Sequence, residues 1–239
     1  MPTFSGQYGA WVGSFRQRVI RGLLLALIAA APIGVAVAQP GLQVERKNME
    51  RLSEVSLSAQ HTVSTNEVRV HYTIKNGSSG DIYVLDGMQA RNPSTREPVV
   101  ATGDYSLFLR EPGEALILVG IPPLPKGKLV TVRNMPLATK VASGAIFTQD
   151  LLPIALPLTE RSPYMTAEEL HQLEATTVQR LALAVQFLQA SAPQIEVASV
   201  PYDSAHVSVR TAQTVADARE VKVVLEQKEM VFRVLPGPR

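Results

Sequence analysis

EVRVHYTIKNGSSGDIYVLD, residues 67–86, is the stretch that decides the expected fold. Apolar and polar residues alternate from Val68 to Lys75, which is the period of a strand with one buried face. Residues 76–80, NGSSG, tolerate positive φ angles, and residues 82–85, IYVL, have the composition of a returning strand. The stretch therefore predicts a β-hairpin, beside which further strands are laid.

Further strand-like segments follow at short spacing, separated by proline and glycine. The sequence predicts strands or strand pairs at residues 54–60, 99–100, 105–110 with 114–120, 128–133, 145–158, 206–210 and 220–226 with 229–235. Residues 88–98 read as a loop, and residues 220–235 read as a terminal hairpin. This pattern predicts an all-β, immunoglobulin-like β-sandwich over residues 54–235, either as one unit or as two subdomains dividing near 160–166.

One helix is expected. Thr166 is a candidate N-cap with Glu169 three residues later, a capping box that predicts a short helix near residues 167–175. Residues 178–189 are ambiguous, because their apolar side chains fit both a helical stripe and a strand alternation. A strand is the preferred interpretation, since Thr176-Thr177-Val178 favours β structure, and the long helix stays open as the alternative.

The first 38 residues have the pattern of a signal peptide. Arg16, Arg18 and Arg21 precede an apolar run, and Ala36-Val37-Ala38 is a small-residue cleavage site. We expect cleavage after Ala38 and a periplasmic or secreted protein, with residues 39–53 as a flexible lead-in; the Arg-rich and Ala-rich leader suggests a bacterium. The alternative is a retained anchor, but the apolar run of residues 23–38 is shorter than the roughly 20 residues that span a bilayer.

Composition then narrows the function classes. The chain holds 23 basic and 21 acidic residues, and three of the basic ones lie in the leader, so the mature chain has 20 against 21 and a net charge of −1. The basic isoelectric point therefore comes from the leader, and no nucleic-acid partner is expected. The chain has no cysteine, so its stability must come from a packed core rather than from disulfides.

The sequence predicts no catalytic, cofactor-binding or metal residues. The four histidines, His61, His71, His171 and His206, lack HxH or HExxH spacing. His61 and His71 can alternatively meet on adjacent strands, but a solvent-facing histidine on each strand is the preferred interpretation. No GxSxG, GxGxxG or GK[ST] motif is present in the mature sequence. The pair Glu168-Glu169 is explained by the start of a helix. A hydrolase would have to assemble its site from distant residues.

Two segments are candidate binding elements. Residues 121–125, IPPLP, are a stiff connection that can alternatively serve as a docking peptide for an aromatic groove. Lys126, Lys128, Arg133 and Lys140 form a modest basic cluster around it, which is expected to be solvated and can alternatively hold an anionic glycan or lipid head group.

The arrangement VRVHYTIKNGSSGDIYVLD resembles the strand–turn–strand opening of exported immunoglobulin-like domains. The mature length and the IPPLPKGKL stretch are similar to those of periplasmic pilus chaperones, which implies binding of client strands by β-augmentation. The resemblance covers at most residues 54–133, and no basic pair can be carried over as the anchor of a partner's carboxylate, so no family is claimed. The expectation is a non-catalytic binding or structural component of the bacterial envelope, monomeric or weakly oligomeric, whose partner is an envelope protein or a glycan.

Overall fold

The computed structural model describes residues 54–125, 127, 129–130 and 134–236, and this part of the chain is mostly β. It contains sixteen strands and two four-residue helices, α2 (Ala167–Leu170) and α3 (Thr214–Asp217). Neither helix of the described part has the length and hydropathy of a membrane span. The all-β class expected from the sequence is confirmed. The signal peptide and the lead-in lie outside the described residues.

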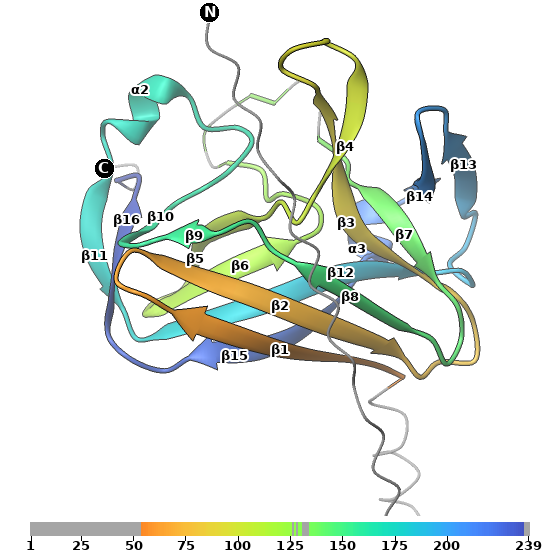
Figure 1. Cartoon of the computed structure of the whole chain (residues 1–239), viewed down its shortest axis with the longest axis horizontal. Coiled ribbons are helices and arrows are strands. Elements are labelled where there is room, and N and C mark those ends of the chain that lie inside the picture. Colours follow the sequence, from red (N-terminus) through yellow and green to blue (C-terminus); the bar gives the residue numbers. More distant parts are fainter. Residues whose placement is uncertain (1–53, 126, 128, 131–133, 237–239) are drawn as a thin grey trace, which may run out of the picture. The chain divides into compact units, whose positions relative to one another are not determined.

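The strands form three sheets (Figure 1). A four-stranded sheet contains β1 (Val55–Val63), β2 (Glu67–Asn76), β8 (Ile146–Asp150) and β9 (Ile154–Ala155). A nine-stranded sheet runs in the order β13 (Glu196–Val200), β14 (Asp203–Arg210), β7 (Leu137–Val141), β3 (Ile82–Arg91), β12 (Arg180–Gln189), β6 (Glu114–Val119) and β5 (Ser106–Glu111), with β15 (Arg219–Glu226) beside β12 and β4 (Pro98–Thr102) beside β3. A three-stranded sheet contains β10 (Leu158–Thr159), β16 (Met230–Val234) and β11 (Glu174–Val178).

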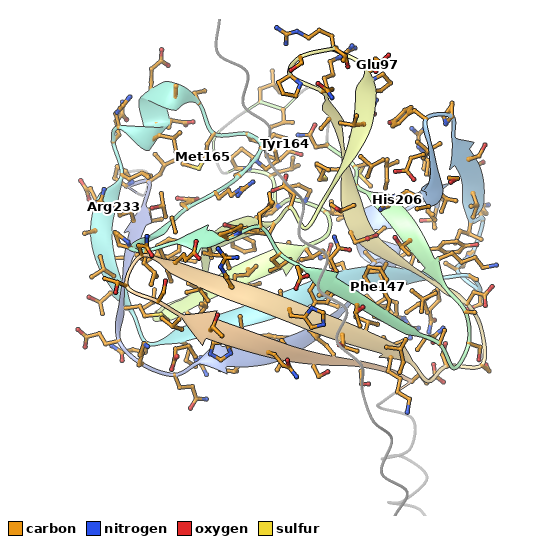
Figure 2. The ribbon with its side chains drawn as sticks, in the orientation of Figure 1. Glu97, Phe147, Tyr164, Met165, His206 and Arg233 are labelled. Carbon is orange, nitrogen blue, oxygen red and sulfur yellow. The ribbon has the colours of Figure 1, made fainter. Side chains whose placement is uncertain are left out.

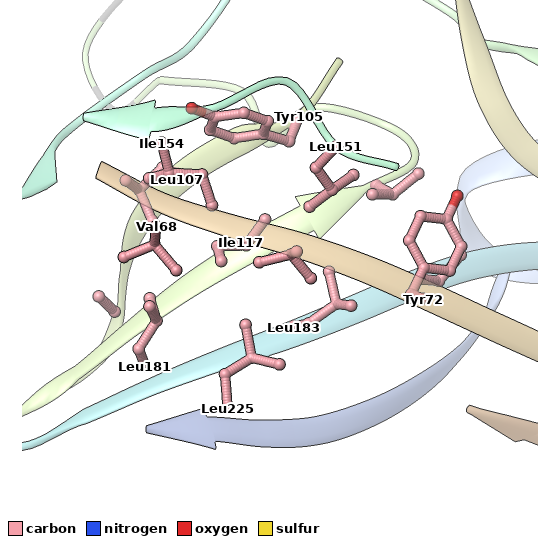
Figure 3. Close-up of a cluster of buried hydrophobic side chains, with 14 of the residues drawn as sticks. Val68, Tyr72, Tyr105, Leu107, Ile117, Leu151, Ile154, Leu181, Leu183 and Leu225 are labelled. Atoms are coloured by element: carbon pink, nitrogen blue, oxygen red, sulfur yellow. The ribbon is translucent and has the colours of Figure 1, made fainter. Parts of the chain in front are cut away.

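The main core lies where the four-stranded sheet packs against the nine-stranded sheet. Strand β2 turns Val68, Val70, Tyr72 and Ile74 inward, as its alternation predicts. They meet inward side chains of β6 and β12, among them Ile117, Leu181 and Leu183 (Figure 3). These residues are at most 2% exposed, and burial of each Leu or Ile side chain is worth roughly 1.5–3 kcal/mol.

Strand β12 has paired neighbours along both of its edges. Residues 180–185 pair in parallel with β6, and residues 187–189 pair antiparallel with β3. Residues 181–187 pair antiparallel with β15. The interpretation of residues 178–189 as a strand is therefore correct, and a strand buried on both faces explains why its apolar run is almost continuous.

The predicted hairpin of residues 67–86 is wrong in its pairing, although both of its strands exist. β2 pairs with β1, β8 and β9, whereas β3 belongs to the nine-stranded sheet, so the NGSSG turn crosses between sheets. The side chain of Asn76 fixes this crossover. Its amide donates to the carbonyls of Val141 and Ala142 at 3.0 and 3.1 Å, and its oxygen accepts from the Ser78 hydroxyl at 2.6 Å. Tertiary hydrogen bonds thus override the local turn signal.

The predicted terminal hairpin is wrong for a similar reason. β15 pairs with β12, and β16 lies between β10 and β11 in another sheet. The hairpin of residues 105–110 and 114–120 is confirmed as β5 and β6, with Gly113 at φ 78° in the turn. The predicted loop at residues 88–98 is also wrong in part, since β3 extends to Arg91 and pairs there with β4, which confirms the short strand at 99–100.

The remaining local predictions meet mixed outcomes. Both hydrogen bonds of the Thr166–Glu169 capping box are present, but α2 ends at Leu170 and β11 begins at Glu174. Strands are present within residues 54–60, 145–158 and 206–210. The sequence predicts neither β7 nor β13. Most of the strand expected at 128–133 lies outside the described residues.

Candidate functional site

A group of buried and half-buried polar side chains closes one end of the main core. We call it the polar cluster; its members are Tyr72, Asp86, Thr139, Asp203 and His206. They come from the successive strands β2 and β3 and from β7 and β14, which are far from both in sequence; β3, β7 and β14 lie side by side in the nine-stranded sheet. The cluster therefore exists only in the folded chain.

Asp86 is the buried carboxylate at the centre of the cluster. It follows Ile82 and Val84 on the inward face of β3 and is 3% exposed. Its Oδ1 accepts from the backbone N–H of Thr139 at 2.9 Å, and its Oδ2 accepts from the Thr139 hydroxyl at 3.0 Å. These two bonds offset part of the cost of burying a charge.

His206 lies on β14 (Figure 2), and its side chain approaches Asp86. Its Nε2 lies 3.6 Å from Asp86 Oδ2, too far for a hydrogen bond, and has no hydrogen-bond partner among the described residues. Close approach depends on the glycine at position 87, because a Cβ there would stand 2.8 Å from Cδ2 of His206. A missing side chain on β3 thus makes room for the imidazole.

Asp203 holds the other side of the imidazole. Its Oδ1 lies 3.2 Å from His206 Nδ1. The same oxygen accepts hydrogen bonds from the backbone N–H groups of Ala205 and His206, an arrangement typical of an Asx-turn. The pKa of His206 is raised, mainly by Asp86 and further by Asp203. Burial acts in the opposite direction and lowers the pKa, but its effect is smaller. Burial alone would raise the pKa of Asp203, but the hydrogen bonds from Ala205 and His206 together lower it below its ordinary value.

Tyr72 brings a buried hydroxyl to the same place. Figure 3 shows its ring at one end of the core, with the hydroxyl directed away from the aliphatic side chains. The hydroxyl has no partner in the described part of the chain, and burial followed by the charge of Asp86 raises its pKa. Gln149 of β8, with its amide oriented to satisfy both ends, donates to Asp86 Oδ2 at 3.1 Å and accepts from the Gly103 N–H.

A small cavity of about 150 Å³ lies beside Asp86. Asp104, Tyr105 and Arg161 also line it. The Arg161 guanidinium lies 2.5 Å from Asp104 and 4.5 Å from the centre of the Tyr105 ring, so its charge is engaged within the cavity wall. The volume suits a few water molecules rather than a drug-sized ligand, which needs roughly 300–1,000 Å³.

This arrangement can store a proton. A protonated His206 has one carboxylate on each side, whereas the neutral ring satisfies only one of them. A general base must also reach the proton of a substrate, and the Nε2 atom is buried in this conformation. The geometry therefore favours a role in protein stability over direct contact with a substrate.

The other histidines lie elsewhere. The pairing of His61 with Val70 and of Gln60 with His71 places the two histidines on opposite faces, so the contact between them, the less favoured alternative from the sequence, does not form. His61 Nε2 is 3.7 Å from Glu226, His71 Nδ1 is 2.8 Å from Asp150, and His171 is the C-cap of α2. Within residues 54–125, 127, 129–130 and 134–236, no three acidic or histidine side chains gather in a metal-binding group.

The other segments singled out from sequence have structural roles where they are described. Ser78 in the NGSSG turn is bonded to Asn76, and Glu168 and Glu169 lie in the first turn of α2. In the run 121–125, Ile121 is buried and Leu124 borders a surface groove. Lys140 lies 2.8 Å from Asp81; the rest of the basic cluster falls outside the described residues.

A second feature of interest is the β13–β14 hairpin at the periphery of the nine-stranded sheet (Figure 1). β13 is the last strand in the order, with β14 along one edge and no strand of the described chain along the other. Four of its five side chains are exposed, and Val197 retains 45% of its surface. An unpaired edge of this kind offers backbone N–H and C=O groups to another strand.

Comparison with known protein families, curated proteins and solved structures gives no match for this chain.

Proposed function

We propose that the protein is an exported, non-catalytic binding component of the bacterial envelope, and that it takes an extended segment of a partner protein against β13. The observation that supports this most directly is the free outer edge of β13. Export is supported by the leader pattern of residues 1–38, and a non-catalytic role by the buried position of the His206 Nε2 atom. An immunoglobulin-like topology remains part of this proposal.

The chemistry of β13 favours a partner strand with one apolar face. Val197 is paired with Val209 of β14, which is 3% exposed and belongs to a second apolar cluster of the sheet. A strand added beyond β13 would continue this apolar face and cover Val197. Its backbone would supply the hydrogen bonds and its alternate side chains the selectivity, as in β-augmentation.

Not every peripheral strand offers such an edge. β5 also ends the nine-stranded sheet, but its Leu107 exchanges backbone hydrogen bonds with Arg161, at 2.9 and 2.8 Å. This bridge occupies the middle of the β5 edge. β13 carries no comparable bridge among the described residues.

The test begins with a photo-crosslinking amino acid at position 197, in the bacterium that produces the protein. Val231 is the matched control, because it is 51% exposed on β16, which has strands on both sides. We expect an adduct with one envelope protein from position 197 and none from position 231. The cross-linked segment, made as a peptide, should then bind the purified protein.

The variant Val197→Lys places a charge on the edge and should weaken binding of that peptide about tenfold, or roughly 1.4 kcal/mol. Val231→Lys should leave the binding unchanged. Equal adduct yields at both positions, or a peptide affinity indifferent to Val197→Lys, would rule out β13 as the binding edge.

A further inference from the structure

The β13–β14 hairpin is joined to the rest of its sheet through few backbone pairs. β13 and β14 are paired over five residue pairs, but β14 is paired with β7 at only two, His206 with Thr139 and Val207 with Ala138. His206 is therefore one of the two residues through which the hairpin enters the sheet. The side chains of His206 and Val207 should therefore contribute much of the free energy that holds the hairpin to the sheet.

The imidazole of His206 links the hairpin to the body of the protein by charge. Asp203 belongs to the hairpin itself, whereas Asp86 belongs to β3 and is bonded to Thr139 of β7. A protonated ring donates to Asp203 and faces Asp86 with its second N–H. A neutral ring that keeps its bond to Asp203 turns a bare nitrogen toward the Asp86 carboxylate, which is repulsive.

The surroundings of the ring are well defined. From β2, the uncharged Tyr72 hydroxyl faces Asp86, and from β8 the Gln149 amide does so. From β4, Val100 approaches Gly87 beside the ring. Across the small cavity, Asp104 is paired with Arg161.

Further along the same face of β14, Arg210 is exposed and its backbone partner on β13 is Glu196. Asp86 and Asp203 are thus the two charges that act on the ring most closely.

We propose that the protonation of His206 fastens the β13–β14 hairpin to the sheet, so that the hairpin is held firmly in mildly acidic solution and loosens as the solution becomes alkaline. The consequence for binding rests on the function proposed above: a partner strand on β13 should bind more tightly at pH 6 than at pH 8.5, because a loosened hairpin presents a less ordered edge.

The direction follows from the raised pKa of His206. A group whose pKa is higher in the folded protein contributes its full stabilisation below its ordinary value, about 6.5 for histidine. The contribution declines as the pH rises from there and is lost above the raised pKa. The lowered pKa of Asp203 keeps its carboxylate charged to below its ordinary value of about 3.9, so the acidic limit lies well under the histidine range.

The test is backbone amide hydrogen exchange in the mature protein between pH 5.5 and 9, corrected for the intrinsic pH dependence of exchange. We expect the protection of residues 196–210, relative to that of β12, to fall about tenfold for each unit by which the folded pKa exceeds 6.5. His206→Gln should make the ratio independent of pH. His71→Gln is the control, because its exposed pair with Asp150 lies on another sheet, and it should keep the wild-type profile.

If His206→Gln does not fold, Asp203→Asn serves instead, since that side chain is 23% exposed and its removal weakens one half of the interaction. A hairpin protection that is flat with pH in the unmutated protein would overturn the proposal. The same is true of a pH dependence that survives both variants. Exchange needs no partner, so a confirmed pH response with no peptide binding would leave this inference standing and contradict the proposed function alone.

Discussion

The main core has an apolar body and a polar end, and the two are held together differently. In the body, Val68, Ile117 and Leu183 are each essentially buried and touch many neighbours without directional bonds. At the polar end, Asp86 and His206 are buried to a similar degree, but they depend on particular partners, Thr139 for Asp86 and Asp203 for the Nδ1 atom of His206.

This difference teaches where the structure tolerates change. An apolar side chain can be exchanged for another of similar volume at a modest cost, because its neighbours repack around it. A buried carboxylate cannot, since its removal leaves donors such as the Thr139 N–H without an acceptor. The effect of a substitution on stability should therefore depend on side-chain volume in the apolar body and on hydrogen-bonding groups at the polar end.

The largest effect is expected in the body. Leu183→Ala removes a side chain with no exposed surface from the middle of β12, and should lower the free energy of unfolding by about 2–5 kcal/mol. Urea unfolding measures this loss, which should be the same at pH 6 and pH 8 because no titrating group is touched. A conservative Leu183→Met change should cost less than about 1.5 kcal/mol. A loss that differs markedly between the two pH values would contradict the distinction drawn between the apolar body and the polar end.

A smaller loss is expected from Asp86→Ala. The variant leaves the Thr139 N–H and hydroxyl unsatisfied, so the free energy of unfolding should fall by about 1–3 kcal/mol. Asp150→Ala is the control, because this exposed residue pairs with His71 at the surface, where such a pair is worth about 0–1 kcal/mol. Equal losses in thermal or urea unfolding for the two variants would show that the polar end is no different from the surface.

The smallest effect on stability is expected from Tyr72→Phe, which removes one hydroxyl and leaves the shape of the ring unchanged. Tyr72→Phe keeps the ring in the core and removes a buried hydroxyl that has no partner among the described residues. The free energy of unfolding should change by less than about 0.5 kcal/mol, or rise slightly, since an unsatisfied polar group costs energy. A loss above about 1 kcal/mol would mean that the hydroxyl makes a stabilising hydrogen bond, for example to a buried water.

The sequence was informative about local structure and poor on pairing. Alternation in Val68–Ile74 identified β2 and its inward face, because side-chain direction in a strand depends only on neighbouring residues. The partner of a strand depends on distant residues. One signal was available: residues 82–85 are continuously apolar, which is typical of a strand buried on both faces in the interior of a sheet, whereas β2 alternates.

No sequence pattern predicts the polar cluster, because its members are scattered from β2 to β14. In the sequence, His206 is one of four histidines without a metal-binding spacing. Its nearest local signal is Asp203 three residues earlier, which captures its Nδ1. No local pattern points to Asp86, which lies 120 positions before His206 in the sequence. The two residues come close only because β3, β7 and β14 lie side by side in the sheet.

The position of β12 has a consequence for how the chain is made. This strand fills the space between β15 on one side and β3 and β6 on the other, yet it begins only at Arg180. Until residues 180–189 have emerged, β3 and β6 each lack a neighbour, and such bare edges invite association between nascent chains. Assembly of the nine-stranded sheet should therefore occur late and slowly, after residues 180–189 have emerged, and fragments that stop short of Arg180 should aggregate.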